Sequence, residues 1–220
     1  MYTERMYTET SSGRRLTGFA LLAAGTLLFA QALFMYLAQT PPSDVAGVQA
    51  WIGSGKQSLM MANELLFFAA AAMAVALIGL YKLLAKNALV LATVGCSFLG
   101  IATVLQFVLC IIQGRLVYPV LSQVLTGENM VLMTSLFYGG LHTVYLLLAG
   151  VSLTLGVAMK YSGYGAHMIY AGAVSAVAAM ATAYPWMITP TVMLLAQVVV
   201  SLWFVWIGRR VLATRQGSYS

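Results

Sequence analysis

Six long apolar stretches dominate the chain and limit the folds that it can adopt. They lie at roughly residues 16–38, 59–83, 88–113, 135–159, 166–186 and 190–208. A helix of about 20 apolar residues crosses the roughly 30 Å of hydrocarbon in a bilayer, with all its backbone hydrogen bonds internal. Charged residues make up only 7% of the chain, against about a quarter in soluble domains. We therefore expect an all-α, polytopic membrane protein, a six-transmembrane-helix bundle.

Basic residues are distributed unequally between the two sides of this predicted bundle. One side carries two, Lys56 and Arg115. The other side carries nine: Arg5, Arg14, Arg15, Lys82, Lys86, Lys160, Arg209, Arg210 and Arg215. Because cytoplasmic loops are enriched in Lys and Arg, this imbalance predicts that both termini are cytoplasmic. The expected organisation is a cytoplasmic N-tail (1–15), a transmembrane domain (16–208) and a cytoplasmic C-tail (209–220). The net charge of +6 is then a topology signal, and we expect no nucleic-acid partner.

Two ionisable residues interrupt the apolar stretches at matching positions. Glu64 lies eighteen residues before Lys82, and His142 lies eighteen residues before Lys160. In parallel helices both would lie about 27 Å from the basic side of the membrane. Ionisable groups inside a membrane are costly and usually face the bundle interior or a watery cavity. We expect Glu64 to point into the bundle toward His142, so that the two titrations are coupled.

Side-chain amides fall near the same depth. Gln106 is twenty residues from Lys86 and Gln31 is sixteen from Arg15, which places both within about 5 Å of the level of Glu64. Asn63 is the neighbour of Glu64. The sequence therefore predicts a candidate polar pocket, formed by Glu64, His142, Gln106, Gln31 and Asn63.

Each of these residues also has a plainer interpretation. Glu64 lies in the headgroup interface if its helix begins a few residues later. His142 would be a packed histidine bonded to a serine or a carbonyl group. The amides would then serve as interhelical contacts, worth about 1 kcal/mol or less.

Other chemistry is poorly represented in the sequence. Cys96 and Cys110 lie fourteen residues apart, roughly 21 Å along a helix, beyond the reach of a disulfide. His142 and His167 are expected at different depths, so they would not share a metal ion. Motifs of hydrolases, nucleotide-binding loops and zinc proteases are absent. The sequence assigns no catalytic residue, no metal ligand and no cofactor, and an enzyme would have to use Glu64 and His142.

The last two apolar stretches differ in side-chain size. Small residues recur at every fourth position of the fifth stretch, at Ala171, Ser175, Ala179 and Ala183. Such a stripe lets helix backbones approach closely, so we expect the fifth helix to be the most enclosed. The sixth stretch, "MLLAQVVVSLWFVWIG", is bulkier, and we expect it to face lipid or a partner subunit.

Several segments resemble an uncharacterised family of bacterial six-span membrane proteins, known as a domain of unknown function, number forty-three eighty-six. They are a basic N-tail before "TGFALLAAGTLLF", a long first outer connection, "NELLFFAAAAMAVALIGLYKLL" with its early glutamate, and "GVAMKYSGYGAHMIYAG". The resemblance covers nearly the whole chain. It implies six helices and a location in the bacterial inner membrane, and it lends no activity or site residues.

Three functions follow from these observations. The first is a small transporter or a ligand-binding sensor with an outward-facing polar pocket. The second is a structural or accessory subunit that binds a larger membrane complex through its fifth and sixth helices. The third is a membrane-embedded enzyme that acts on a lipid or a quinone. The expected partners are the lipid bilayer and a membrane protein, either a different chain or a second copy of this one.

Overall fold

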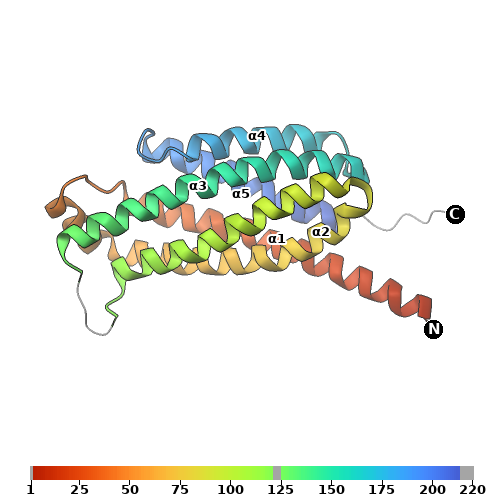
Figure 1. Cartoon of the computed structure of the whole chain (residues 1–220), viewed down its shortest axis with the longest axis horizontal. Helices are drawn as coiled ribbons and strands as arrows, with labels where there is room; N and C mark the ends of the chain where they lie inside the picture. The colour runs from red at the N-terminus through yellow and green to blue at the C-terminus, as the bar shows by residue number, and fades with distance from the viewer. Residues whose placement is uncertain (1, 121–124, 214–220) are drawn as a thin grey trace.

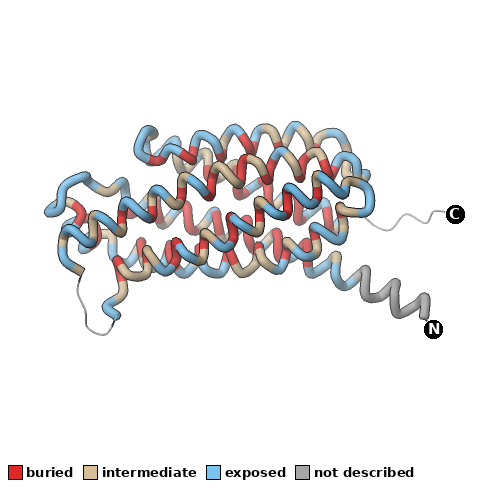
Figure 2. The backbone as a smooth tube through the Cα atoms, viewed as in Figure 1, coloured by how far each residue is buried: buried red, intermediate tan, exposed pale blue. Residues whose placement is uncertain are grey.

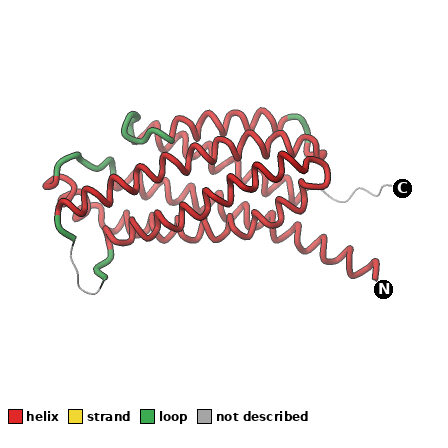
Figure 3. Tube along the Cα trace, viewed as in Figure 1, coloured by secondary structure: helices red, strands yellow, loops and turns green. Residues whose placement is uncertain are grey.

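Most of the described chain is helical, and its loops are the connections between helices (Figure 3). A computed structural model describes residues 2–120 and 125–213, with side chains from residue 12 onward. The elements are α1 (Tyr2–Ala38), α2 (Val45–Val117), α3 (Gly127–Met159), the short π-helix η1 (Lys160–Tyr164), α4 (His167–Thr182) and α5 (Pro190–Ala213). The described residues contain no strand, which confirms the predicted all-α class.

Four described segments are long and apolar enough to cross a membrane. They are Ser12–Ala38, Val45–Val117, Gly127–Tyr164 and Pro190–Ala213, and their most apolar windows have mean hydropathies between 1.8 and 2.2. Together they indicate a multi-pass membrane protein. Helix α4 is also apolar but has 16 residues, fewer than the 17–25 or so that normally span a bilayer.

Helix α2 folds back on itself as a hairpin (Figure 1). Its helical geometry is interrupted at Ala88, where φ is −148° and ψ is 54°. Cross-contacts join residues on the two sides of this break: the Gln113 side chain donates to the Leu59 carbonyl, and the Phe67 and Phe107 rings meet edge to face. The expected spans 59–83 and 88–113 therefore lie in the two antiparallel arms of α2.

The helices run along one common direction, so the bundle has two distinct ends (Figure 1). We call one of them the basic end. It holds the start of α1, the turn of α2, η1 and the end of α5. Its described charged side chains are seven basic ones and no acidic one: Arg14, Arg15, Lys82, Lys86, Lys160, Arg209 and Arg210. The α1–α2 and α4–α5 connections lie at the opposite end (Figure 1).

Glycines hold α1 and α5 in close contact. A Cβ atom added at Gly25 would lie 2.7 Å from the Ser201 carbonyl oxygen, and one at Gly208 would lie 2.8 Å from the Gly18 carbonyl oxygen. Trp203 and Phe204 of α5 are consequently buried, although Leu202 is exposed. The expectation that the sixth stretch faces lipid or a partner subunit is wrong for this face. The glycines of α1 leave space for the bulky side chains of α5 to pack inside the bundle.

Small residues also join α3 to α4. The Ser152 and Ser175 hydroxyls are hydrogen-bonded at 2.9 Å, and Ser175, Ala179 and Ala183 are fully buried. The predicted packing role of this stripe is confirmed at these positions. The prediction that this helix is the most enclosed is wrong, because α4 lies at the edge of the bundle and exposes its other face (Figure 2), including Tyr170, Val174, Val177 and Met180.

Candidate functional site: a polar layer across the bundle

Five buried polar side chains from four helices surround a small cavity in the middle of the bundle. They are Gln31 of α1, Gln106 of α2, Tyr145 of α3, and Gln197 and Ser201 of α5. We call them the polar layer. Each is at most 7% exposed, and apolar side chains such as Leu28, Leu66 and Leu148 complete the wall of the central cavity.

Helical spacing explains why α5 contributes twice to this layer. Gln197 and Ser201 are four residues apart and so share one face of the helix. That face turns toward α1 because Gly25 allows the backbone of Ser201 to approach. The polar pair is thereby placed in the interior, although its helix is otherwise apolar.

The hydrogen bonds of the polar layer are only partly satisfied within the chain. The side chains of Tyr145 and Gln197 are hydrogen-bonded to each other. The Gln106 Oε1 atom is buried and has no hydrogen-bond partner among the described residues. An unpaired buried acceptor costs about 1–3 kcal/mol. The space in the central cavity that is open to the centre of a water molecule has a volume of about 10 Å³. It therefore has room for about one water, which would satisfy such a group.

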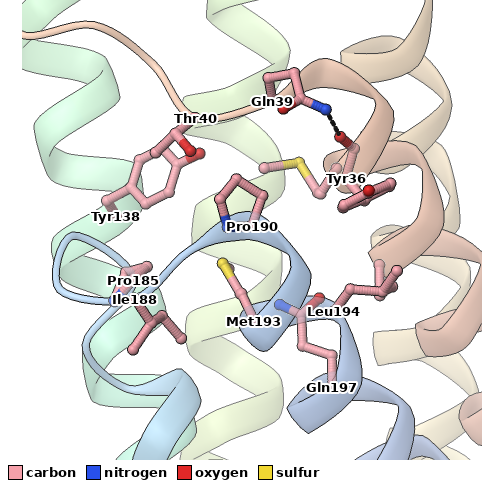
Figure 4. Close-up of a pocket in the computed structure, with 12 residues that line it drawn as sticks. Tyr36, Gln39, Thr40, Tyr138, Pro185, Ile188, Pro190, Met193, Leu194 and Gln197 are labelled. Atoms are coloured by element: carbon pink, nitrogen blue, oxygen red, sulfur yellow. Dashed lines mark hydrogen bonds between the residues drawn. The ribbon is translucent and has the colours of Figure 1, made fainter.

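A second cavity, the end cavity, lies between α1, α3 and the start of α5 (Figure 4). Its volume on the same measure is about 20 Å³. Tyr36, Gln39 and Thr40 form one side of it, and Gln197 lies at the far side (Figure 4). Gln39 and Thr40 are exposed at the opposite end of the bundle.

Gln197 lines both cavities. Gln197 therefore lies between the cavity lined by the exposed Gln39 and Thr40 and the cavity lined by the buried Gln106. The Gln39 amide donates to the Tyr36 carbonyl at 2.7 Å, and Gln39 has a positive φ of 63°. This left-handed residue ends α1 and turns the chain across the rim of the end cavity.

Glu64 lies outside this layer. Its side chain is exposed, and its carboxylate accepts a hydrogen bond of 2.7 Å from the Tyr118 hydroxyl. Burial, this hydrogen bond and the charge of the carboxylate raise the pKa of Tyr118 to about 12. The prediction that Glu64 points into the bundle is wrong, since its position on the first arm of α2 faces outward.

His142 has its own partners at the α3–α4 interface. Its Nδ1 atom lies 2.6 Å from the Ala183 carbonyl oxygen, and its ring packs against the rings of Tyr184 and Trp186. Glu64 and His142 thus have different partners, and neither lines the central cavity. Their shared distance from a basic residue fixes a depth, but it does not fix the direction in which each helix face points.

Asn63 is buried between the two arms of α2. Its carbonyl oxygen lies 3.8 Å from the Cys110 sulfur, and its Oδ1 atom has no partner among the described residues. Of the five predicted pocket residues, the structure brings Gln31 and Gln106 together at the central cavity. Sequence reasoning missed Tyr145, Gln197 and Ser201. The spacing of Gln197 and Ser201 in an apolar helix was the signal that would have identified the last two.

The chemistry of the site is that of neutral hydrogen-bonding groups. No charged side chain is among the described residues that line the two cavities. In the part of the chain that the structure covers, no three His, Cys, Asp or Glu side chains are close enough to hold a metal ion. Both cysteines are free and buried. The site offers amides and hydroxyls that both donate and accept.

Comparisons of the chain with protein-family models, with curated proteins and with solved structures find no match.

Proposed function

We propose that the chain is a six-span membrane protein that binds a small, uncharged, hydrogen-bonding solute at the polar layer, in a state in which the central and end cavities are wider than the water-sized spaces described above. Such a protein is a small transporter or a solute sensor. Both termini would be cytoplasmic, and the end cavity would open toward the outside of the bacterial inner membrane. The resemblance to the six-span family is consistent with this proposal.

The arrangement of the helices supports six spans. The two arms of α2 are separate rods joined at Ala88, which adds one crossing to the four long segments. Helix α4 would be the sixth crossing, because it runs beside α3 and the connection after Thr182 returns the chain to α5 (Figure 1). The seven basic residues of the basic end support a cytoplasmic location for it.

The partly unsatisfied polar layer carries the proposal of a solute. Gln106 is 2% exposed and its Oε1 atom lacks a partner within the described chain, while Gln31, Tyr145 and Ser201 surround the same space. Desolvating a charged ligand there would be expensive without an opposite charge. A neutral solute carrying both donors and acceptors would instead exchange water hydrogen bonds for protein ones.

A ligand-dependent stability measurement tests this function. Protein in lipid nanodiscs would be heated with millimolar amides, ureas and small polyols, and with charged analogues of similar size such as carboxylates and alkylammonium ions. A bound ligand stabilises the folded state by RT ln(1 + [L]/Kd). We expect a saturable rise in Tm with at least one uncharged solute and none with the charged analogues.

Variants separate binding at this site from general solvent effects. Gln106→Leu and Gln197→Leu should abolish the solute-dependent rise in Tm. Asn63→Leu is the matched control, since Asn63 is also a buried amide of α2 whose oxygen lacks a partner in the described chain, but it lines neither cavity. A rise that survives Gln106→Leu and Gln197→Leu, or that only charged solutes produce, would refute the proposal.

A further inference from the structure

A third, more open cavity lies between α4 and α5 on the outside of the bundle. It has a volume of about 430 Å³, and we call it the α4–α5 groove. The residues that matter here are His167, Tyr170 and Val174 of α4, and Leu202, Trp203 and Trp206 of α5. It shares none of its residues with the central or end cavity.

The side chains that line the groove change in character along its length. Because α4 starts and α5 finishes at the basic end (Figure 1), His167 and Trp206 lie nearest to that end. Val174 and Leu202 lie deeper and are both exposed. The seven residue steps of α4 from His167 to Val174 span roughly 10 Å of helix. The end of the groove with His167 and Trp206 is therefore aromatic and polar, and its deeper part carries the aliphatic Val174 and Leu202 beside the indole of Trp203.

Two nitrogen atoms of groove residues lack partners. Trp203 is 2% exposed and its Nε1–H has no acceptor among the described residues. The Nε2 atom of His167 is also buried without a partner in the described chain, and its ring stacks on Trp206 with centroids 5.6 Å apart. An indole N–H can only donate, so a ligand that satisfies it must present an acceptor.

The charges around the mouth of the groove favour an anionic ligand. Arg209 follows Trp206 by three residues, which places it on the same side of α5 one turn nearer to the basic end, and its side chain is exposed. The described side chains of this end include six other basic residues and no acidic one. Juxtamembrane basic residues attract anionic lipids by about 1 kcal/mol each.

We propose that the α4–α5 groove binds one anionic phospholipid from the leaflet at the basic end. Its acyl chain would lie along Val174 and Leu202. Its phosphate would accept a hydrogen bond from His167 and would face Arg209, and one of its ester carbonyl oxygens, which lie deeper, would accept a hydrogen bond from Trp203. This site is independent of the proposed solute site, because the two have no residue in common.

Quenching of tryptophan fluorescence by brominated lipids tests the proposal. In a Trp51→Phe/Trp186→Phe chain, the remaining tryptophans, Trp203 and Trp206, both line the groove. The protein would be reconstituted in phosphatidylcholine vesicles that contain a small, equal fraction of either brominated phosphatidylglycerol or brominated phosphatidylcholine. We expect the phosphatidylglycerol to quench more strongly, with a relative affinity higher by about fivefold, as one added basic contact would give.

Three variants distinguish a built site from general surface charge. Arg209→Gln and His167→Phe should each bring the relative affinity for phosphatidylglycerol close to that for phosphatidylcholine, and His167→Phe retains an aromatic ring beside Trp206. Arg15→Gln is the matched control, because Arg15 is an exposed basic residue of the same end on a different helix. It should leave the preference unchanged.

Three results would overturn the proposal. They are equal quenching by the two lipids, an equal effect of Arg15→Gln and Arg209→Gln, and relief of quenching by millimolar inorganic phosphate, which would indicate a site for free anions. Trp51 donates to the Ala38 carbonyl, so Trp51→Phe could impair folding. The same comparisons would therefore be repeated in the chain with all four tryptophans, where Trp51 and Trp186 add a background common to every variant.

Discussion

Tyr145 of α3 and Gln197 of α5 are hydrogen-bonded to each other at the point where the central and end cavities meet. Gln197 lines both cavities, whereas Tyr145 lines the central one. This contact joins two helices beside the buried, unsatisfied Gln106. In the proposed function, a solute that moves between the cavities would pass the Gln197 side chain.

The contact should be measurable as a coupling free energy. Polar contacts between membrane helices average about 0.6 kcal/mol, with a maximum of about 1.7 kcal/mol. We expect Tyr145→Phe and Gln197→Leu each to reduce the free energy of unfolding in mixed micelles, and the double variant to lose less than the sum by about 0.6 kcal/mol. Tyr145→Phe combined with Gln113→Leu should be additive, and coupling of the same size in that control would contradict a specific pair.

The close approach of α1 and α5 predicts a large effect from one methyl group. In Gly25→Ala the new Cβ would meet the Ser201 carbonyl oxygen and the Val205 backbone nitrogen, which the helices cannot move aside independently. We expect a loss of about 1–3 kcal/mol in the free energy of unfolding. Because Ser201 belongs to the polar layer, the solute-dependent rise in Tm should also shrink.

Gly139→Ala is the control for this substitution. A Cβ atom at Gly139 of α3 would meet no atom within 4 Å, and alanine is the better helix former by roughly 0.5–1 kcal/mol. Its stability should be unchanged or higher. If Gly25→Ala and Gly139→Ala were equally tolerated, close α1–α5 packing would not contribute to stability.

The Tyr118–Glu64 contact predicts a pH dependence. Burial, the hydrogen bond to Glu64 and the charge of Glu64 raise the pKa of Tyr118 to about 12, above the ordinary value of about 10. The stability that this shift contributes is therefore complete below about pH 10 and is lost as the pH rises through the folded-state pKa. Tyrosinate absorbance, taken as the difference between the wild type and Tyr118→Phe, measures the titration.

Glu64→Gln removes the charge of Glu64, one of the three causes of this shift, and leaves burial and a hydrogen-bond acceptor in place. The midpoint of the Tyr118 titration should therefore fall, but not fully to the ordinary value. A midpoint that stays unchanged in Glu64→Gln would show that the two side chains are not paired in the membrane-embedded protein.

The proposed topology predicts which loops are accessible from outside the cell. In a chain with Cys96→Ala and Cys110→Ala, an impermeant thiol reagent should label Ser54→Cys and Thr126→Cys in intact cells. It should not label Ser162→Cys, which lies in η1 at the basic end. Labelling of Ser162→Cys from outside would invert the topology.

The sequence predicted the helical class and the packing of small residues because both depend on local composition and spacing. Apolar length identified the helices, and the spacing of Ser175, Ala179 and Ala183 identified a buried stripe. The α2 hairpin was expected as two spans, although Ala88 is neither Gly nor Pro. The bounds of α4 were overestimated, because the apolar residues after Thr182 form a turn rather than another helical turn.

The polar site was predicted only in part because depth and direction are separate properties. Gln31 and Gln106 were found from their depth, and both face inward. Glu64 was expected at the same depth, but its face of α2 is exposed. Rotation about the helix axis depends on the neighbours, such as the glycines of α1 that admit α5, and these contacts are not visible in one helix alone.

The most direct test of the central claim is the accessibility of position 197. In the cysteine-free chain, Gln197→Cys also shortens the side chain between the two cavities and so widens the space between them. We expect a small, uncharged methanethiosulfonate to label Gln197→Cys more slowly than Gln39→Cys at the exposed rim. Blocking Gln39→Cys first, with a bulky impermeant reagent added from outside, should slow the labelling of Gln197→Cys. Ala179→Cys, fully buried in the α3–α4 contact, should not react. Failure of Gln197→Cys to react, or a rate that the blocked rim leaves unchanged, would contradict a site that opens outward.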